Sequence, residues 1–225
     1  MPSLQPVERE IAPAPRQRVR RTQEQRSQAT RRALMEAARQ VIGECGYAGT
    51  TMEEIARRAG VSRGAQTHHY PSKQVLVLAV ADHIFANVER EVSDIANRLQ
   101  YSGGNIEAFF NELWETAFSS LNFNIILELV TASRTDPILR DKLQRRWHDL
   151  MAAYDNIWRR ALKRSDGFSE EVRQALELTL SLMRGMAYER VVRDNEPAYY
   201  TEQLGHWAKV VRGIMTGDAA TAESD

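Results

Sequence analysis

The run SRGAQTHHY at residues 62–70 combines side chains that can read double-stranded DNA. Arg63 offers a forked guanidinium that can bond one guanine in two places. Gly64 lets the backbone approach a nucleic acid closely, and Thr67 or His68 can reach a base edge or a phosphate. These residue types therefore point to a surface that enters a DNA groove.

Two short predicted helices would position these side chains. Thr50 and Glu53 fit a capping box that begins the first helix, and Gly60 ends it. Ser62 can cap the second helix, which Pro71 stops. Two helices joined by a glycine turn have the layout of a DNA-binding helix-turn-helix, whose second helix enters the major groove. Any helical protein can hold two short helices and a glycine, so ordinary packing is the alternative at this point.

A preceding helix is predicted to brace this pair. Its apolar face contains Leu34, Ala38, Val41, Ile42 and Cys45, and Gly46 would end it. Thr51 before the motif and Lys73 after it would hold phosphates on the two flanks.

Charge is divided unevenly between the two ends of the chain. The 225 residues hold 30 basic and 30 acidic side chains, yet residues 1–73 carry a net charge of +6 and the remainder −6. Residues 1–26 mix prolines with arginines and read as a flexible basic arm that adds minor-groove or phosphate contacts. The asymmetry favours a polyanionic partner, and the alternative is a solvated charge run.

Residues 28–78 resemble the N-terminal domain of the TetR (tetracycline-repressor) family of transcriptional regulators. The resemblance rests on the ordered run GY-x-x-TTMEEIA-x-x-AGVS-x-G-x-x-x-HHY-x-SK. It favours the helix-turn-helix over ordinary packing. Beyond this quarter of the chain, the resemblance is limited to the number and order of helices.

The resemblance implies a homodimer with two DNA-binding heads that leaves a palindromic operator when a small effector binds its helical body. One departure concerns Gln66 and Thr67, which stand where the family usually has an apolar residue followed by tyrosine. Thr67 is shorter, but it can still bond a phosphate or face a thymine methyl group. The predicted DNA-binding residues are Thr51, Ser62, Arg63, Gly64, Thr67, His68, His69 and Lys73.

The sequence predicts an all-α fold in two parts. Residues 27–72 would form the three-helix DNA-binding domain, and 73–217 a helical domain for effector binding and dimerisation. A long helix from Lys73 to about Leu99 would join the two parts and carry the coupling between them. Further helices are expected at about 105–121, 123–135, 137–164, 169–193 and 197–216, with the apolar run 125–130 in a buried central helix and a disordered tail at 218–225.

The last two predicted helices are the expected dimer interface, because each has apolar residues on more than one face. Val172, Leu176, Leu180, Met183, Ala187 and Val191 would face the core. The residues expected to face a partner are Leu178, Leu182, Gly185, Val192, Trp207 and Val211. Close helix approach at Gly185, Ala208 and Gly213 would give a four-helix bundle across a two-fold axis. A wide stripe covered by its own domain is the alternative.

Aromatic and methionine side chains of the body are candidates for an effector pocket that favours a hydrophobic or aromatic ligand. They are Trp114, Phe118, Phe123, Trp147, Met151, Tyr154, Trp158, Met183 and Met186, with Arg134, His148 or Glu128 as polar anchors. Such a stripe at helical spacing is also typical of an ordinary core. A regulator that binds DNA without an effector, and whose body dimerises or binds a protein, is therefore the second hypothesis.

No catalytic motif stands out, so we expect a protein that is not an enzyme and that needs no cofactor or metal ion. The single cysteine, Cys45, can form no internal disulfide and is expected to be a buried structural thiol. The sequence holds no apolar run of membrane-spanning length and no secretory signal, which predicts a soluble cytoplasmic protein associated with the nucleoid.

Overall fold

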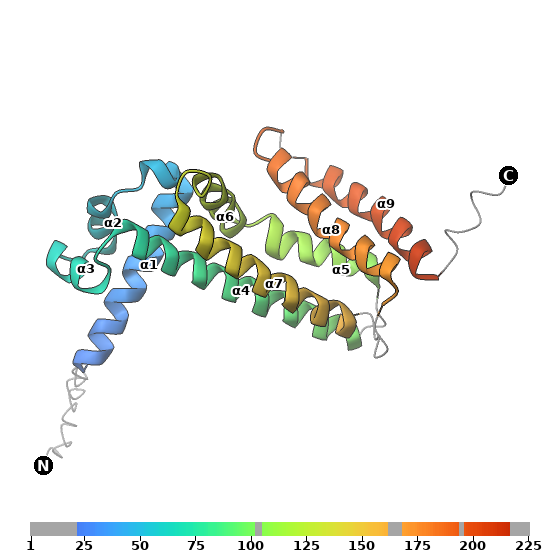
Figure 1. The fold of residues 1–225 in the computed structure, drawn as a ribbon, viewed down its shortest axis with the longest axis horizontal. Helices are drawn as coiled ribbons and strands as arrows, with labels where there is room; N and C mark the ends of the chain where they lie inside the picture. Colours follow the sequence, from blue (N-terminus) through green and yellow to red (C-terminus); the bar gives the residue numbers. More distant parts are fainter. Residues whose placement is uncertain (1–21, 102–104, 162–167, 194–195, 217–225) are drawn as a thin grey trace, which may run out of the picture.

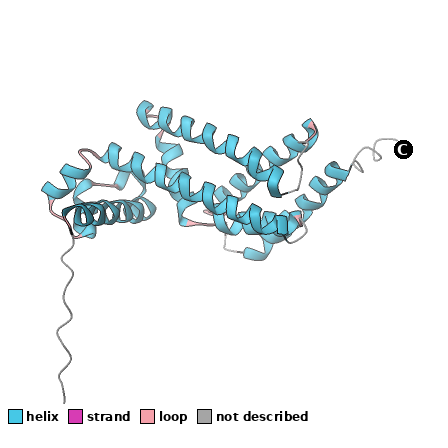
Figure 2. Cartoon of the chain, turned by 90° about the horizontal axis from the view of Figure 1, so that it is seen from below, coloured by secondary structure: helices cyan, strands magenta, loops and turns pink. Residues whose placement is uncertain are grey.

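The computed structural model describes residues 22–101, 105–161, 168–193 and 196–216, and all regular structure in these ranges is helical (Figures 1 and 2). The all-α prediction is confirmed. The elements are α1 (Gln23–Gly49), α2 (Met52–Ala59), α3 (Arg63–His69), α4 (Lys73–Tyr101), α5 (Ile106–Leu113), a π-helical turn (Trp114–Phe118), α6 (Leu121–Ala132), α7 (Pro137–Ala161), α8 (Glu170–Glu189) and α9 (Pro197–Thr216). Most of the predicted arm, the tail and the breaks expected at 103–104 and 166–167 lie outside the described residues.

Helices α1, α2 and α3 form a head at one end of an elongated molecule (Figure 1). Helix α1 begins at Gln23, inside the segment predicted as an arm, because Thr22 and Gln25 form a capping box. Its regular turns stop at Gly46, whose φ of 69° is a left-handed conformation that glycine adopts without strain. The predicted stop at Gly46 is thus present, and α1 continues beyond it to Gly49.

The cap of α2 lies one residue later than the sequence suggested. Thr51 is the N-cap, and its hydroxyl oxygen accepts a hydrogen bond from the Glu54 amide at 3.3 Å. The Thr50 hydroxyl instead donates to the Gly46 carbonyl oxygen at 2.7 Å, so the capping box predicted at Thr50 was wrong. The three other predicted boundaries are confirmed: Gly60 ends α2 in a left-handed conformation, the Ser62 hydroxyl caps α3, and α3 ends at His69, before Pro71.

The body is built around α4 and α7, which lie side by side along its length, while α5 packs on α9 and α8 packs on both α9 and the π turn (Figure 1). Most predicted stripe positions are buried as expected. Two of the positions predicted to lie on a core face are exposed: Cys45 on α1 and Val191 just beyond α8. Val191 was therefore wrongly placed on the core face.

Helix α6 was predicted to be a buried central helix, and its helical form is confirmed but its burial is not. Ile125 and Leu129 are fully buried, whereas Leu121 and Val130 are exposed. The helix lies where head and body meet and packs against α1 and α7. It therefore has two packed sides and an open one.

Asp136 joins head and body at the start of α7. Its carboxylate accepts hydrogen bonds from the Leu139 amide at 3.0 Å, from the Gln74 side chain at 3.2 Å and from the Tyr47 hydroxyl at 3.3 Å. The Leu139 amide bond is the largest of the contributions that lower the pKa of Asp136 below its usual value.

We expect Asp136→Ala to destabilise the protein by about 1–2 kcal/mol, which lowers the melting temperature by roughly 2–8 °C. The exposed Asp141→Ala on the same helix is the control and should leave the temperature unchanged. Because the folded-state pKa is lowered, the stabilisation by Asp136 is present above the unfolded value and is lost as the pH falls through the folded one. Calorimetric melting temperatures of the wild type and of Asp136→Ala, at neutral pH and at pH 3, check both expectations. If the variant melts below the wild type by the same amount at the two pH values, this role of Asp136 is contradicted.

Candidate nucleic-acid interface and ligand cavity

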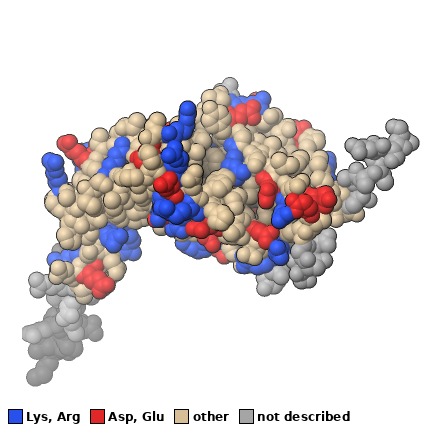
Figure 3. Space-filling view, in the orientation of Figure 1, with Lys and Arg blue, Asp and Glu red and all other residues tan. Residues whose placement is uncertain are grey.

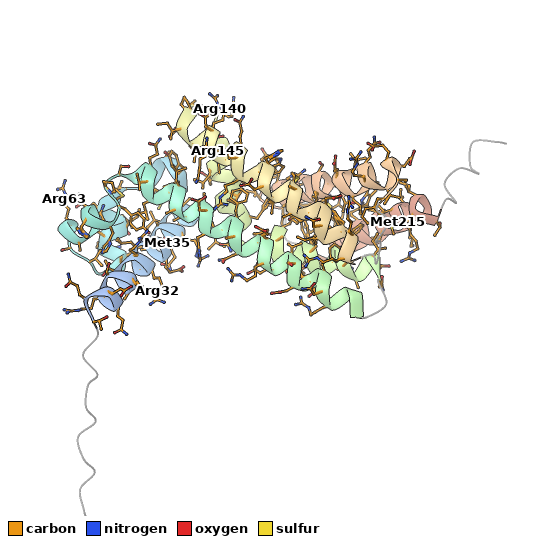
Figure 4. The ribbon with its side chains drawn as sticks, turned by 60° about the horizontal axis from the view of Figure 1, so that its bottom comes forward. Arg32, Met35, Arg63, Arg140, Arg145 and Met215 are labelled. Atoms are coloured by element: carbon orange, nitrogen blue, oxygen red, sulfur yellow. The ribbon has the colours of Figure 1, made fainter. Side chains whose placement is uncertain are left out.

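Helix α3 presents the predicted base-reading side chains on one exposed face. Arg63, Gly64, Thr67 and His68 are all exposed, while Gln66 is 4% exposed and packs inward. Figure 4 shows Arg63 projecting away from the head. A short helix with a polar face outward and one inner face anchored is what major-groove entry requires.

Four arginines of the head have no acidic partner within the described residues. Three others are paired: Arg39 with Glu36, Arg57 with Glu54, and Arg58 with both Glu44 and Glu54. The arginines without an ion pair are Arg26, Arg31, Arg32 and Arg63, of which Arg31 lies over the Tyr70 ring. Figure 4 shows Arg32 and Arg63 on the outside of the head, and Figure 3 shows basic and acidic side chains on both head and body. Unpaired cations are the ones free to take phosphates.

From the sequence, Arg26 was included in the basic arm that was predicted to contact DNA, but Arg31 and Arg32 of α1 were counted only as charge. Arg31 and Arg32 belong to the same predicted helix as the apolar face but lie outside that face, and this is the signal that could have found them.

Several of the predicted DNA-binding residues also make contacts within the protein. The Lys73 ammonium donates to the Tyr47 carbonyl oxygen and lies 4.3 Å from the centre of the Tyr47 ring, and burial lowers the pKa of Lys73. The Thr51 and Ser62 hydroxyls cap α2 and α3. Burial, followed by the charges of His68 and Arg31, lowers the pKa of His69, which favours a neutral ring. Phosphate contacts by these residues stay predictions.

Comparison with known proteins places these features in a family. The family model described as "Bacterial regulatory proteins, tetR family" matches residues 34–80. The HTH-type transcriptional regulator CymR of Pseudomonas putida is 32% identical over 169 residues, which cover 75% of this chain and 82% of that protein. The chain belongs to the TetR family. It is accordingly a helix-turn-helix transcriptional regulator.

Other relatives agree with membership of the TetR family. The HTH-type transcriptional repressor AcnR of Corynebacterium glutamicum is 30% identical over 136 residues, covering 60% of this chain and 65% of that protein. A crystal structure described as a TetR-family regulator from Mesorhizobium loti superposes with a TM-score of 0.71 at 17% identity and covers 84% of this chain and 98% of that one. At this identity, the similarity to the Mesorhizobium loti structure shows that the fold is shared.

The body of this TetR-family protein contains an apolar cavity of about 50 Å³ between α4, the π turn, α6, α7 and α8. Five predicted pocket residues line it: Phe118, Phe123, Trp147, Met151 and Tyr154. Trp158 lines an adjoining groove of about 490 Å³ between α7 and α8. Trp114, Met183 and Met186 line none of these spaces and are buried in the core. The cavity also has a lining residue that the sequence pattern did not indicate, Arg184 of α8.

Of the predicted polar anchors, two lie beside a second groove and one is elsewhere. Arg134 and His148 line a groove of about 980 Å³ that shares Trp147 and Met151 with the cavity. Glu128 faces the head instead, where its carboxylate accepts a hydrogen bond from the Tyr47 amide at 3.2 Å. The assignment of Glu128 to the pocket was therefore wrong.

Helix α6 connects the cavity to the head. Its residues Asn122, Phe123 and Ile126 line the cavity, and the Asn122 amide oxygen also accepts from Arg39 of α1 at 3.5 Å. Glu128, on the same helix, fits so closely against α1 that a Cβ at Gly46 would lie 2.8 Å from its Oε2. Helix α6 therefore contacts both the cavity and the head, and the coupling predicted through α4 stays a prediction.

The predicted dimer face is only partly exposed. Leu178, Leu182, Gly185 and Val192 are exposed, and nothing lies within 4 Å of a Cβ built at Gly185. Val211, by contrast, is fully buried in its own chain, and Trp207 is half-buried with its indole donating to the Thr179 hydroxyl at 2.8 Å. Val211 is therefore a core residue, and its exposed neighbour Val210 takes the outward position.

Cys45 is exposed, which corrects the expectation of a buried thiol. The last turn of α1 is covered by α6 over Gly43 and Gly46, and this leaves Cys45 outside the contact. Within the described ranges, no cluster of three or more potential metal ligands is present. None of the described helices is long and apolar enough to cross a membrane.

Proposed function

We propose that this regulator is a homodimeric repressor that binds a palindromic operator and leaves it when a small apolar or aromatic effector enters the body. The exposed face of α3 carries the DNA-binding half of the proposal, and Arg63 at its first turn has no ion pair with any residue that the structure describes. Contacts to DNA by Thr51, Ser62, Gly64, Thr67, His68, His69 and Lys73 belong to the same proposal.

A second copy of the chain supplies the second head. Six of the eleven large apolar side chains that are exposed in the described ranges lie on or beside α8 and α9: Leu178, Leu182, Tyr188, Val191, Val192 and Val210. An exposed apolar surface of this kind favours association, and a two-fold axis matches a palindromic site.

The effector half of the proposal rests on the cavity and on α6. A ligand between α6 and α7 would displace the helix whose Glu128 and Asn122 bind α1, and so would alter the spacing of the two heads. Operator affinity then changes by the difference in ligand affinity between the two head positions. The π turn supports this role, because such irregular turns are frequent at functional sites.

We expect Glu128→Ala to weaken this coupling, because it removes the acceptor of the Tyr47 amide. The measure is the ratio of operator Kd with and without a ligand that raises the melting temperature of the wild type. A coupling free energy of about 1–3 kcal/mol corresponds to a ratio of roughly 5–150 in the wild type. In Glu128→Ala we expect this ratio of operator Kd values to be several-fold closer to one. Glu91→Ala, an exposed change on α4, is the control, and equal ratios in the two variants contradict the α6 route.

The alternative is a dimeric regulator that uses no small effector. The observation in its favour is the cavity volume of about 50 Å³, since ligand pockets usually measure about 300–1,000 Å³. The adjoining grooves, of about 980 and 490 Å³, share Trp147 and Met151 with it and favour the effector hypothesis.

Selection of bound sequences from a random DNA pool by the full-length protein tests the proposed function. We expect enrichment of a two-fold palindrome, with an affinity that falls as salt rises. Binding that depends on salt but prefers no sequence would overturn the proposal.

A further inference from the structure

We propose that the effector carries a carboxylate group, which pairs with Arg184 while the apolar remainder of the molecule fills the cavity between α4, α6 and α7. This inference rests on the proposed effector function and adds the chemical class of the ligand.

Arg184 is a half-buried cation without an acidic partner. Among the described residues no carboxylate lies within 4.0 Å of its guanidinium, and its one side-chain hydrogen bond goes to the Ser181 hydroxyl at 2.9 Å. The guanidinium lies 4.6 Å from the centre of the Trp147 ring. Burial lowers the pKa of Arg184, but a guanidinium remains protonated in proteins. A partly desolvated charge of this kind is unfavourable unless an anion accompanies it.

Tyr154 provides a neutral donor in the same cavity. The side chain is 4% exposed, and within the described ranges its hydroxyl makes no hydrogen bond. Burial raises the pKa of Tyr154, so the phenol stays protonated and can donate. A carboxylate has two oxygens, and Arg184 together with Tyr154 could satisfy both.

The remainder of the lining contains no acidic side chain. Apart from Arg184, Tyr154 and the Asn122 amide, every lining residue is apolar, and Phe85, Phe118 and Phe123 contribute aromatic rings. Two acids line the adjoining groove between α7 and α8: Asp155, which pairs with Arg159, and Glu177, which is exposed. An anion is therefore favoured here and a cation is disfavoured.

The shape of the site limits the size of the ligand. The inner cavity holds about 50 Å³ and widens past Trp147 and Met151 into the two grooves. Arg184 lines both the cavity and the groove between α7 and α8, at the boundary between them. A compact aromatic or short aliphatic acid could place its carboxylate at this boundary and its apolar part inward.

The test compares acids with their neutral amides on the full-length protein. The probes are benzoate, phenylacetate and octanoate against benzamide, phenylacetamide and octanamide, and the readouts are melting temperature and the calorimetric Kd. We expect at least one acid to raise the melting temperature while its amide does not. Arg184→Gln should weaken binding of that acid about ten-fold or more, and Tyr154→Phe about three-fold.

Arg98→Gln is the matched control, because Arg98 is an exposed arginine of the body that pairs with Glu112 and lines none of these spaces. It should bind the acid as the wild type does. Amides that bind as well as the acids, or an Arg184→Gln variant that binds the acid undiminished, would overturn the carboxylate assignment and leave the effector function standing. The absence of any shift with all six probes would also overturn it, and pool selection reports separately on DNA binding.

Discussion

Leu178→Glu is expected to convert the protein into a monomer and to lower its affinity for the operator by about 10²–10⁴-fold, the range that loss of bivalent binding implies. Leu178 is 57% exposed on α8 and has Leu182 one turn further along the same face. In a dimer this position would be covered by the partner, where an unpaired carboxylate is strongly unfavourable.

The change should spare the fold of the single chain, because substitutions of exposed side chains usually alter stability by about 0.5 kcal/mol or less. Ile138→Glu provides a closely matched control: Ile138 is 59% exposed and lies on α7, away from α8 and α9. Light scattering and operator titration distinguish the two variants. If Leu178→Glu remains a dimer with unaltered affinity, the α8 face is not the interface.

The head could be predicted from sequence because its signals are local. The left-handed backbone of Gly60 ends α2, and the hydroxyl of Ser62 caps the start of α3. The error at the start of α2 has a simple cause. Thr50 and Thr51 are each followed by a glutamate three residues later, so the sequence fits a capping box in either register. The register is decided by the Thr50 hydroxyl, which bonds back to Gly46.

The body was harder to predict because its decisive contacts join residues far apart in the chain. Periodicity identifies an apolar face, but it does not give the rotation of the helix to within one residue, and Val211 and Val210 were confused for this reason. Glu128 was predicted to anchor a ligand, but it lies on the side of α6 that packs against α1, and no local pattern in the sequence shows that contact. The role of Arg184 depends on the absence of a described acidic partner, which no local pattern encodes.

Arg63→Ala is expected to weaken sequence-specific binding strongly while leaving the fold intact. A bidentate arginine–guanine pair contributes about 1–3 kcal/mol of discrimination, and a dimer loses it in both heads, so affinity for the selected operator should fall by roughly 30-fold to 10⁴-fold. Arg63 is exposed and has no ion pair among the described residues, so its removal leaves no buried carboxylate unpaired.

Arg32→Ala separates the reading of bases from the binding of phosphates. Arg32 is an exposed arginine of α1 without a described partner, and its removal should weaken binding to operator and to random DNA by the same factor. It should also reduce the slope of log affinity against log salt by about 0.9 for each phosphate that the variant no longer neutralises. Arg57→Ala, which removes an exposed arginine already paired with Glu54, is the control and should change neither quantity.

Because Arg63→Ala lowers operator affinity more than random-DNA affinity, the ratio of the two affinities tests base reading. A ratio that Arg63→Ala leaves unchanged would mean that Arg63 contacts phosphates and reads no base.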